Sequence, residues 1–178
     1  MRFDNVRAMI VDTRGAEIAE AAAVLPLMFM ILLGIFWFGQ AFSIYGTITR
    51  AAQEGARAAA LPYCATCSGG STPVANAVTA VQNTLTAANL NLSLAQPPTT
   101  PPSFNACNAG GSTSCNGSSS NVCVQMPVQL STPVPGAAGL CGVSVSFRYP
   151  FQFWLPFTSL NNQRVWMTAS ARVRMENQ

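Results

Sequence analysis

A run without charged residues, from Ala21 to Thr49, constrains this chain more than any other feature. An α-helix rises about 1.5 Å per residue, so about 20 apolar residues cross the hydrocarbon core of a bilayer. The apolar part of a secretory signal peptide has about 7–15 residues and is followed by a cleavage site between small residues. Because this run is about twice that length and continues smoothly, we expect an uncleaved membrane-spanning helix over residues 21–45.

The residues that follow the span extend the same helix. Residues 51–60 read AAQEGARAAA and have a high helix propensity, whereas Pro62 disfavours its continuation. We therefore expect one long helix over residues 16–61. It would separate a cytoplasmic leader or tail, residues 1–15, from a domain outside the cytoplasm, residues 62–178.

Composition limits the classes of function that this chain can have. Residues 58–147 carry no charge but are rich in Ser, Thr, Asn, Gln, Gly and Pro, which indicates a solvated surface rather than a second span. A net charge of +3 without any lysine provides no basic patch for nucleic acid. The absence of histidine removes the usual general base and the usual metal ligand. We expect a non-enzymatic protein with no cofactor and no metal.

All six cysteines follow the span in the sequence. Their even number and their placement on one side predict disulfides in an oxidising compartment, while the sequence leaves the pairing open. The candidates are Cys64, Cys67, Cys107, Cys115, Cys123 and Cys141. Cys64 and Cys67 form a C-x-x-C motif, for which a redox site or half of a zinc site is the alternative interpretation. A structural disulfide is the favoured one, because no second C-x-x-C and no histidine accompany the motif.

Charges near the span indicate its orientation. Three arginines precede the span and two follow it closely, which by the positive-inside rule slightly favours a cytoplasmic N-terminus. The cysteines support this orientation more strongly, because thiols that face the cytosol would stay reduced. The C-terminal domain is therefore expected in the periplasm or outside the cell.

Small residues in the span predict contacts with other helices. Gly39, Ser43 and Thr47 are spaced by four residues, and Gly34 and Gly46 lie nearby. Such spacing lets helix backbones approach closely in a membrane, although glycines are also common in spans without this role. The expected partners are the lipid bilayer and other membrane subunits. Glu20 at the membrane edge either meets Arg14 at the cytoplasmic face or has the more specific role described next.

The residues Arg14 to Glu20, RGAEIAE, followed by an apolar helix, resemble the start of type IV pilin-like precursors. In that family a polar leader ends in glycine, a prepilin peptidase cuts after it, and a glutamate is the fifth residue of the mature chain. The resemblance implies a cut between Gly15 and Ala16, with Glu20 as the fifth residue. The new α-ammonium group on Ala16 would need a counter-charge at the membrane edge, which Glu20 can supply.

Four further segments, residues 24–27, 34–35, 38–41 and 49–57, resemble the TadE-like pseudopilins of tight-adherence pilus systems. The resemblance implies a bacterial inner-membrane protein that takes part in the assembly of a pilus or secretion filament through helix packing. One alternative is a stationary accessory subunit that braces a larger membrane complex. A redox or binding enzyme that acts through Cys64 and Cys67 is another.

The remaining sequence predicts an α+β domain. Thr72 and Pro73 are typical of a helix start, and the helical spacing that follows predicts a second, amphipathic helix from about Pro73 to Leu92. Residues 96–121 have the composition of a loop. Alternating runs at residues 122–130, 143–149 and 165–175 predict a small antiparallel sheet against which both helices pack. Pro127 cannot donate to a strand ladder, which predicts an edge strand. The aromatic segment 149–157 either contacts a partner or membrane or caps the sheet.

Overall fold

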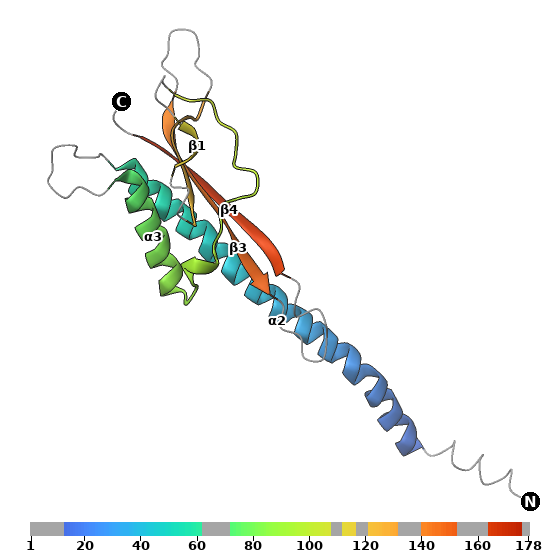
Figure 1. The fold of residues 1–178 in the computed structure, drawn as a ribbon. Coiled ribbons are helices and arrows are strands. Elements are labelled where there is room, and N and C mark those ends of the chain that lie inside the picture. Colours follow the sequence, from blue (N-terminus) through green and yellow to red (C-terminus); the bar gives the residue numbers. More distant parts are fainter. Residues whose placement is uncertain are drawn as a thin grey trace, which may run out of the picture. The chain divides into compact units, whose positions relative to one another are not determined.

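The computed structural model describes residues 13–61, 72–107, 112–116, 121–131, 140–152 and 164–175. The chain divides into two compact units, Met1–Phe42 and Ser43–Gln178. The long helix α2, Thr13–Ala60, contributes to both units (Figure 1). This confirms the long helix expected from the sequence. Pro26 lies inside α2 without ending it.

The second helix of the Ser43–Gln178 unit begins as the sequence predicts. Helix α3 spans Pro73–Ala87, and the Thr72 side chain caps it by accepting a hydrogen bond from the Ala75 amide at 3.2 Å. Proline at the first helical position costs no hydrogen bond, because an N–H group at this position would have no acceptor within the helix. The hydroxyl of Thr84 donates to the carbonyl of Ala80 at 2.9 Å, within α3.

Helix α3 ends five residues before the predicted Leu92, so that prediction was wrong at its C-terminus. Asn89 has a φ of 57°, the left-handed conformation that commonly terminates helices. The amide of Leu90 then donates to the carbonyl of Leu85 at 2.8 Å, and the amide of Asn89 to Thr86 at 3.0 Å. These two bonds form a Schellman motif. A short 3₁₀ helix, η1 at Leu92–Leu94, follows.

A four-stranded antiparallel sheet completes the α+β fold. Its order is β1-β2-β3-β4, with β1 at Ser112–Asn116, β2 at Cys123–Gln129, β3 at Cys141–Gln152 and β4 at Arg164–Arg174. Strands β2, β3 and β4 confirm the three alternating runs in the sequence. Strand β1 lies in the stretch predicted as a loop, residues 96–121, because its Ser, Thr, Cys and Asn residues show no apolar alternation.

Pro127 does not mark an edge strand, because β2 lies between β1 and β3. Its pairing with β3 shifts between Gln125 and Val128: Gln125 is opposite Ser144, and Val128 is opposite Gly142. One extra residue in β2 therefore forms a bulge that includes Pro127. A bulge interrupts the ladder, so proline is tolerated in this interior strand.

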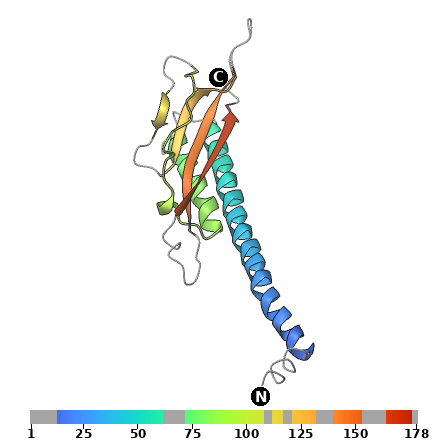
Figure 2. The same ribbon diagram turned by 90° about the vertical axis from the view of Figure 1, so that its right-hand side faces the viewer.

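One face of the sheet packs against α3 and the Ser43–Ala60 part of α2 (Figures 1 and 2). The buried residues of this core alternate along the strands and repeat at helical spacing along both helices. They include Ile48, Ala51, Ala52, Ala56, Ala59, Ala77, Val81, Leu85, Val122, Val124, Val143, Val145, Phe147, Tyr149, Ala169 and Ala171. This pattern is the α-on-β packing that the sequence predicts.

The segment from Gln96 to Cys107 crosses the other face. It begins beside β3, where the backbone of Gln96 pairs with Arg148, and it ends beside β2, where Ala106 is opposite Val128. In between, the side-chain amide of Gln125 donates to the carbonyl of Pro102 at 3.0 Å. This segment explains why the polar side chains of Gln125, Ser144 and Ser146 are buried although they point away from the apolar core.

Candidate interaction surfaces of the long helix

The part of α2 in the first unit exposes apolar side chains around its whole circumference. A helix that is apolar all round belongs in a protein core or in a membrane, and these side chains are not covered by other described residues. Among the described residues, α2 is long and apolar enough to cross a bilayer. The exposed side chains include Val24, Leu25, Leu27, Met28, Phe29, Met30, Ile31, Leu32, Ile35, Phe36, Phe38 and Phe42.

The faces of α2 differ in the second unit. Ile48, Ala52 and Ala59 point into the core, whereas Arg50 and Arg57 are exposed. At 3.6 residues per turn, Ser43, Gly46, Arg50, Gln53 and Arg57 fall within a narrow stripe opposite the buried face. All five are exposed. The second unit thus leaves one continuous stripe of α2 open along its length.

The four small residues predicted for helix packing do not all share this stripe. Gly39 is exposed, and the helical repeat aligns it with Ser43, which is also exposed. Gly34 is half-buried and lies on another side of the helix, whereas Thr47 is half-buried at the edge of the stripe. Gly46 aligns with Gly39 and Ser43. A Cβ atom added at Gly34, Gly39 or Gly46 would have no atom within 4 Å.

Hydroxyl groups near the end of the apolar run bind their own helix. The hydroxyl of Thr47 donates to the carbonyl of Ser43 at 2.9 Å, and that of Thr49 donates to the carbonyl of Tyr45 at 2.8 Å. A hydroxyl paired in this way carries no unsatisfied donor into an apolar environment. Helix contacts along this stretch therefore depend on shape more than on new hydrogen bonds.

The residues predicted for processing lie near the start of α2. Gly15 is exposed and lies inside the helix, which begins at Thr13. Ala16 follows it within the helix, and Glu20 is exposed. The helix therefore places Glu20 about one turn beyond the expected new N-terminus. Whether cleavage occurs and whether Glu20 pairs with an α-ammonium group stay predictions.

The run AAQEGAR, residues 51–57, has a packing role that sequence reasoning did not recognise. A Cβ atom on Gly55 would lie 2.6 Å from Val81 Cγ2, 3.2 Å from the Ala77 carbonyl oxygen and 3.5 Å from Val145 Cγ1. Glycine therefore permits the close approach of α2, α3 and β3 at this position. The small residues at 51, 52, 55, 56 and 59 repeat at helical spacing, and this signal in the sequence could have revealed the packing.

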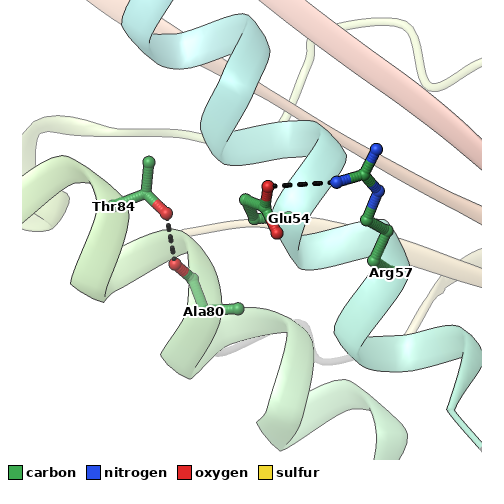
Figure 3. Close-up of polar contacts among 4 residues, drawn as sticks. All are labelled: Glu54, Arg57, Ala80 and Thr84. Carbon is green, nitrogen blue, oxygen red and sulfur yellow. Dashed lines mark hydrogen bonds and ion pairs between the residues drawn. The ribbon is translucent and has the colours of Figure 1, made fainter.

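The two charged residues of the same run point away from the packed face. Glu54 Oε1 and Arg57 Nη1 are 3.3 Å apart, and their side chains are 41% and 67% exposed (Figure 3). Figure 3 also shows α3 beside this part of α2, with the Thr84–Ala80 bond on α3. The ion pair is thus a surface feature of α2 rather than a contact between the helices.

Four of the six candidate cysteines form two disulfides. Cys107 pairs with Cys141, and Cys115 pairs with Cys123. The first joins the segment that crosses the sheet to the start of β3, and the second joins β1 to β2. Cys64 and Cys67 lie outside the described residues. Within the described ranges, no group of three or more metal-binding side chains occurs.

Together these features indicate a membrane-anchored protein in which one long helix supplies both the anchor and part of the core of an α+β unit. Residues 15–57 match the family model described as TadE-like protein. The match covers the apolar part of α2 and its packed continuation as far as Arg57, and it supports a TadE-like protein. A pilus-assembly-related membrane protein is therefore indicated. No curated protein and no solved structure matches the chain.

Proposed function

We propose that this protein is a TadE-like pseudopilin that acts, without enzymatic activity, in the assembly of a pilus or secretion filament. The span would pack laterally against the spans of other subunits in the bilayer. The observation that carries this proposal is the open stripe of α2, on which Gly39, Ser43 and Gly46 align opposite the face that the α+β unit buries. Small residues at such positions let two backbones approach closely.

Processing by a prepilin peptidase is the second part of the proposal. A cut after Gly15 would leave Ala16 with a positively charged α-ammonium group at the membrane edge. Glu20, on the same helix or on that of a neighbour, would supply the counter-charge that such a group needs in a poorly solvated environment. This pairing would set the register between adjacent subunits.

The proposed location is the bacterial inner membrane, with a cytoplasmic N-terminus and the α+β unit in the periplasm or outside the cell. The two disulfides support this orientation, because disulfides persist in oxidising compartments and are rare in the cytosol.

N-terminal sequencing and intact mass of the membrane-extracted protein test the processing step. We expect a chain that begins at Ala16 and a Gly15→Leu variant that keeps its first 15 residues. Gly34→Leu is the matched control, because it introduces the same side chain into the same helix away from the cut. A parent protein that still contains residues 1–15 would end the processing proposal.

A pair of variants tests the packing surface. Gly39→Ile places a branched side chain on the open stripe, whereas Gly34→Ile places it on another side of the same helix. We expect Gly39→Ile to weaken chemical crosslinking between subunits in native membranes and Gly34→Ile to leave it nearly unchanged. Equal loss in both variants, or loss in Gly34→Ile alone, would contradict packing through this stripe.

The alternative function is a stationary accessory subunit that braces a larger membrane complex. One observation favours it: the bond between Gly15 and Ala16 lies within α2, whereas proteolytic cuts are most frequent in exposed loops. A mature protein that still begins at Met1 would support this alternative.

A further inference from the structure

The end of the sheet formed by Gln152 and Arg164 lies level with the end of the second unit at which α2 becomes apolar. Gly55 of α2 faces Val145 of β3 across the core, because a Cβ atom on Gly55 would lie 3.5 Å from Val145 Cγ1. From Gly55 back to Ser43 is about 18 Å along a helix, and from Val145 forward to Phe151 is about 20 Å along a strand. The helix from Gly55 to Ser43 and the strand from Val145 to Phe151 lead to the same end of the unit, which the contact between Asn91 and Tyr149 establishes.

The contact between Asn91 and Tyr149 fixes the direction of β3. Helix α3 runs antiparallel to α2, so its C-terminal end lies toward Ser43 (Figures 1 and 2). The amide of Asn91, just beyond α3, donates to the hydroxyl of Tyr149 at 3.2 Å. Strand β3 therefore approaches the Ser43 end as its residue numbers rise. Strand β4, which pairs Arg164 with Gln152, starts at this end.

This end of the unit exposes apolar and basic side chains together. Leu94 is 48% exposed, Val165 is 47% exposed, and Trp166 is 37% exposed. Arg164 is exposed beside them. We name Leu94, Arg164, Val165 and Trp166 the sheet-end surface. In the described part of the second unit the one carboxylate is Glu54, which is paired with Arg57 farther along α2.

The indole of Trp166 is held in place by an arginine. The guanidinium carbon of Arg148 lies 4.5 Å from the centre of the Trp166 ring, and Arg148 Nη2 donates to Gln96 Oε1 at 2.8 Å. The cation–π contact and the hydrogen bond fix the arginine and the ring together. Tryptophan with neighbouring arginine is the combination that favours the headgroup region of a membrane.

We propose that the sheet-end surface binds anionic lipid headgroups of the bilayer that α2 crosses, with Trp166 and Val165 at the headgroup level and Arg164 beside a phosphate. Charge and chain connectivity favour lipid headgroups as the ligand. The sheet-end surface is basic and apolar, and α2, which is part of the same unit, continues into the apolar run. The inference rests on the proposed insertion of α2, and it goes beyond that insertion because it assigns a second membrane contact to the α+β unit.

Fluorescence of Trp166 in reconstituted protein tests this contact. Trp37→Phe and Trp154→Phe leave Trp166 as the single tryptophan of the full chain, which has three. The protein is placed in phosphatidylcholine vesicles with or without phosphatidylglycerol, and a small fraction of the lipid carries a nitroxide on its headgroup. We expect strong quenching of Trp166 by the nitroxide lipid in the anionic vesicles and shielding from aqueous acrylamide.

A matched pair of charge reversals isolates the lipid contact. Arg164 and Arg174 lie on the same face of β4, ten residues and about 33 Å apart. One unit of charge near an anionic membrane changes binding about five-fold. Arg164→Glu changes the charge by two units, so it should lower the equilibrium constant for contact between the sheet-end surface and the membrane roughly 25-fold. Arg174→Glu makes the same change in net charge at the far end and should leave the quenching nearly unchanged.

The outcomes separate this inference from the proposed function. Protein that does not float with the vesicles after a carbonate wash overturns both. Floated protein whose Trp166 is not quenched by the nitroxide lipid overturns this inference alone. Equal quenching in neutral and anionic vesicles, or equal effects of the two charge reversals, would also overturn it. Shielding from acrylamide without lipid quenching would indicate contact with another protein and would count against the lipid.

Discussion

At Gly55, α2, α3 and β3 approach so closely that an added Cβ atom would lie 2.6 Å from Val81 Cγ2. We expect Gly55→Ala to destabilise the fold by up to about 2 kcal/mol, because overpacking costs about 1–3 kcal/mol and the higher helix propensity of alanine offsets about 1 kcal/mol. Gly46→Ala, where a Cβ would meet no atom within 4 Å, should be stabilising. Chemical unfolding of the full chain in detergent measures both. A Gly55→Ala variant as stable as Gly46→Ala would contradict the close approach.

The ion pair next to Gly55 should contribute little to stability. Glu54 and Arg57 are exposed neighbours on one helix, and such pairs contribute about 0.5 kcal/mol or less. We therefore expect Glu54→Gln to change the unfolding free energy by less than about 0.5 kcal/mol. If the same variant still impairs assembly, Glu54 acts on a partner. A loss above about 1 kcal/mol would show instead that the pair supports the fold.

At the scale of elements, the sequence predicted the helices and strands whose apolar residues follow a regular spacing. The apolar run predicted α2, and alternating residues predicted β2, β3 and β4. It did not predict β1, because the polar residues of β1 show no apolar alternation and its pairing with β2 is secured by the bond between Cys115 and Cys123. Nor did it predict that Pro127 lies at a bulge of an interior strand, because a bulge is set by the register of two strands.

The candidate interaction surfaces were predicted only in part, for a related reason. The spacing of Gly39 and Ser43 is local, so the sequence reveals it. Which side of α2 stays open depends on where α3 and the sheet pack, and that follows from contacts distant in sequence such as Gly55 with Val81 and Val145. Gly34 and Thr47 therefore could not be separated from Gly39 and Ser43 without the structure.

The two disulfides should differ in what they contribute. Loop-closure entropy predicts about 4 kcal/mol for Cys107–Cys141, which are 34 residues apart, and about 2.5 kcal/mol for Cys115–Cys123, which are 8 residues apart. We expect the double serine variant of the first pair to lose more stability than that of the second. Urea unfolding of the two variants without reductant measures the difference, and the opposite order would contradict the entropy argument.

At the scale of the whole molecule, α2 belongs to the membrane anchor and to the core of the α+β unit. A fragment of residues 43–178 keeps Ile48, Ala52 and Ala59 in that core, whereas a fragment of residues 62–178 loses them. We expect the longer fragment to fold and the shorter one to stay unfolded. Near-ultraviolet circular dichroism distinguishes the two, and a folded shorter fragment would show that the sheet and α3 are stable without α2.

The sheet of this unit is secured differently on its two faces. Apolar burial against the helices holds one face, whereas a polar segment fastened by Cys107 and Cys141 covers the other. Heating would therefore weaken the contacts on both faces, whereas failure to form the Cys107–Cys141 disulfide would weaken only the face that the polar segment covers. Newly made chains without this disulfide would carry a finished helical layer and an unfastened cover, and a protease would cut them at that cover first.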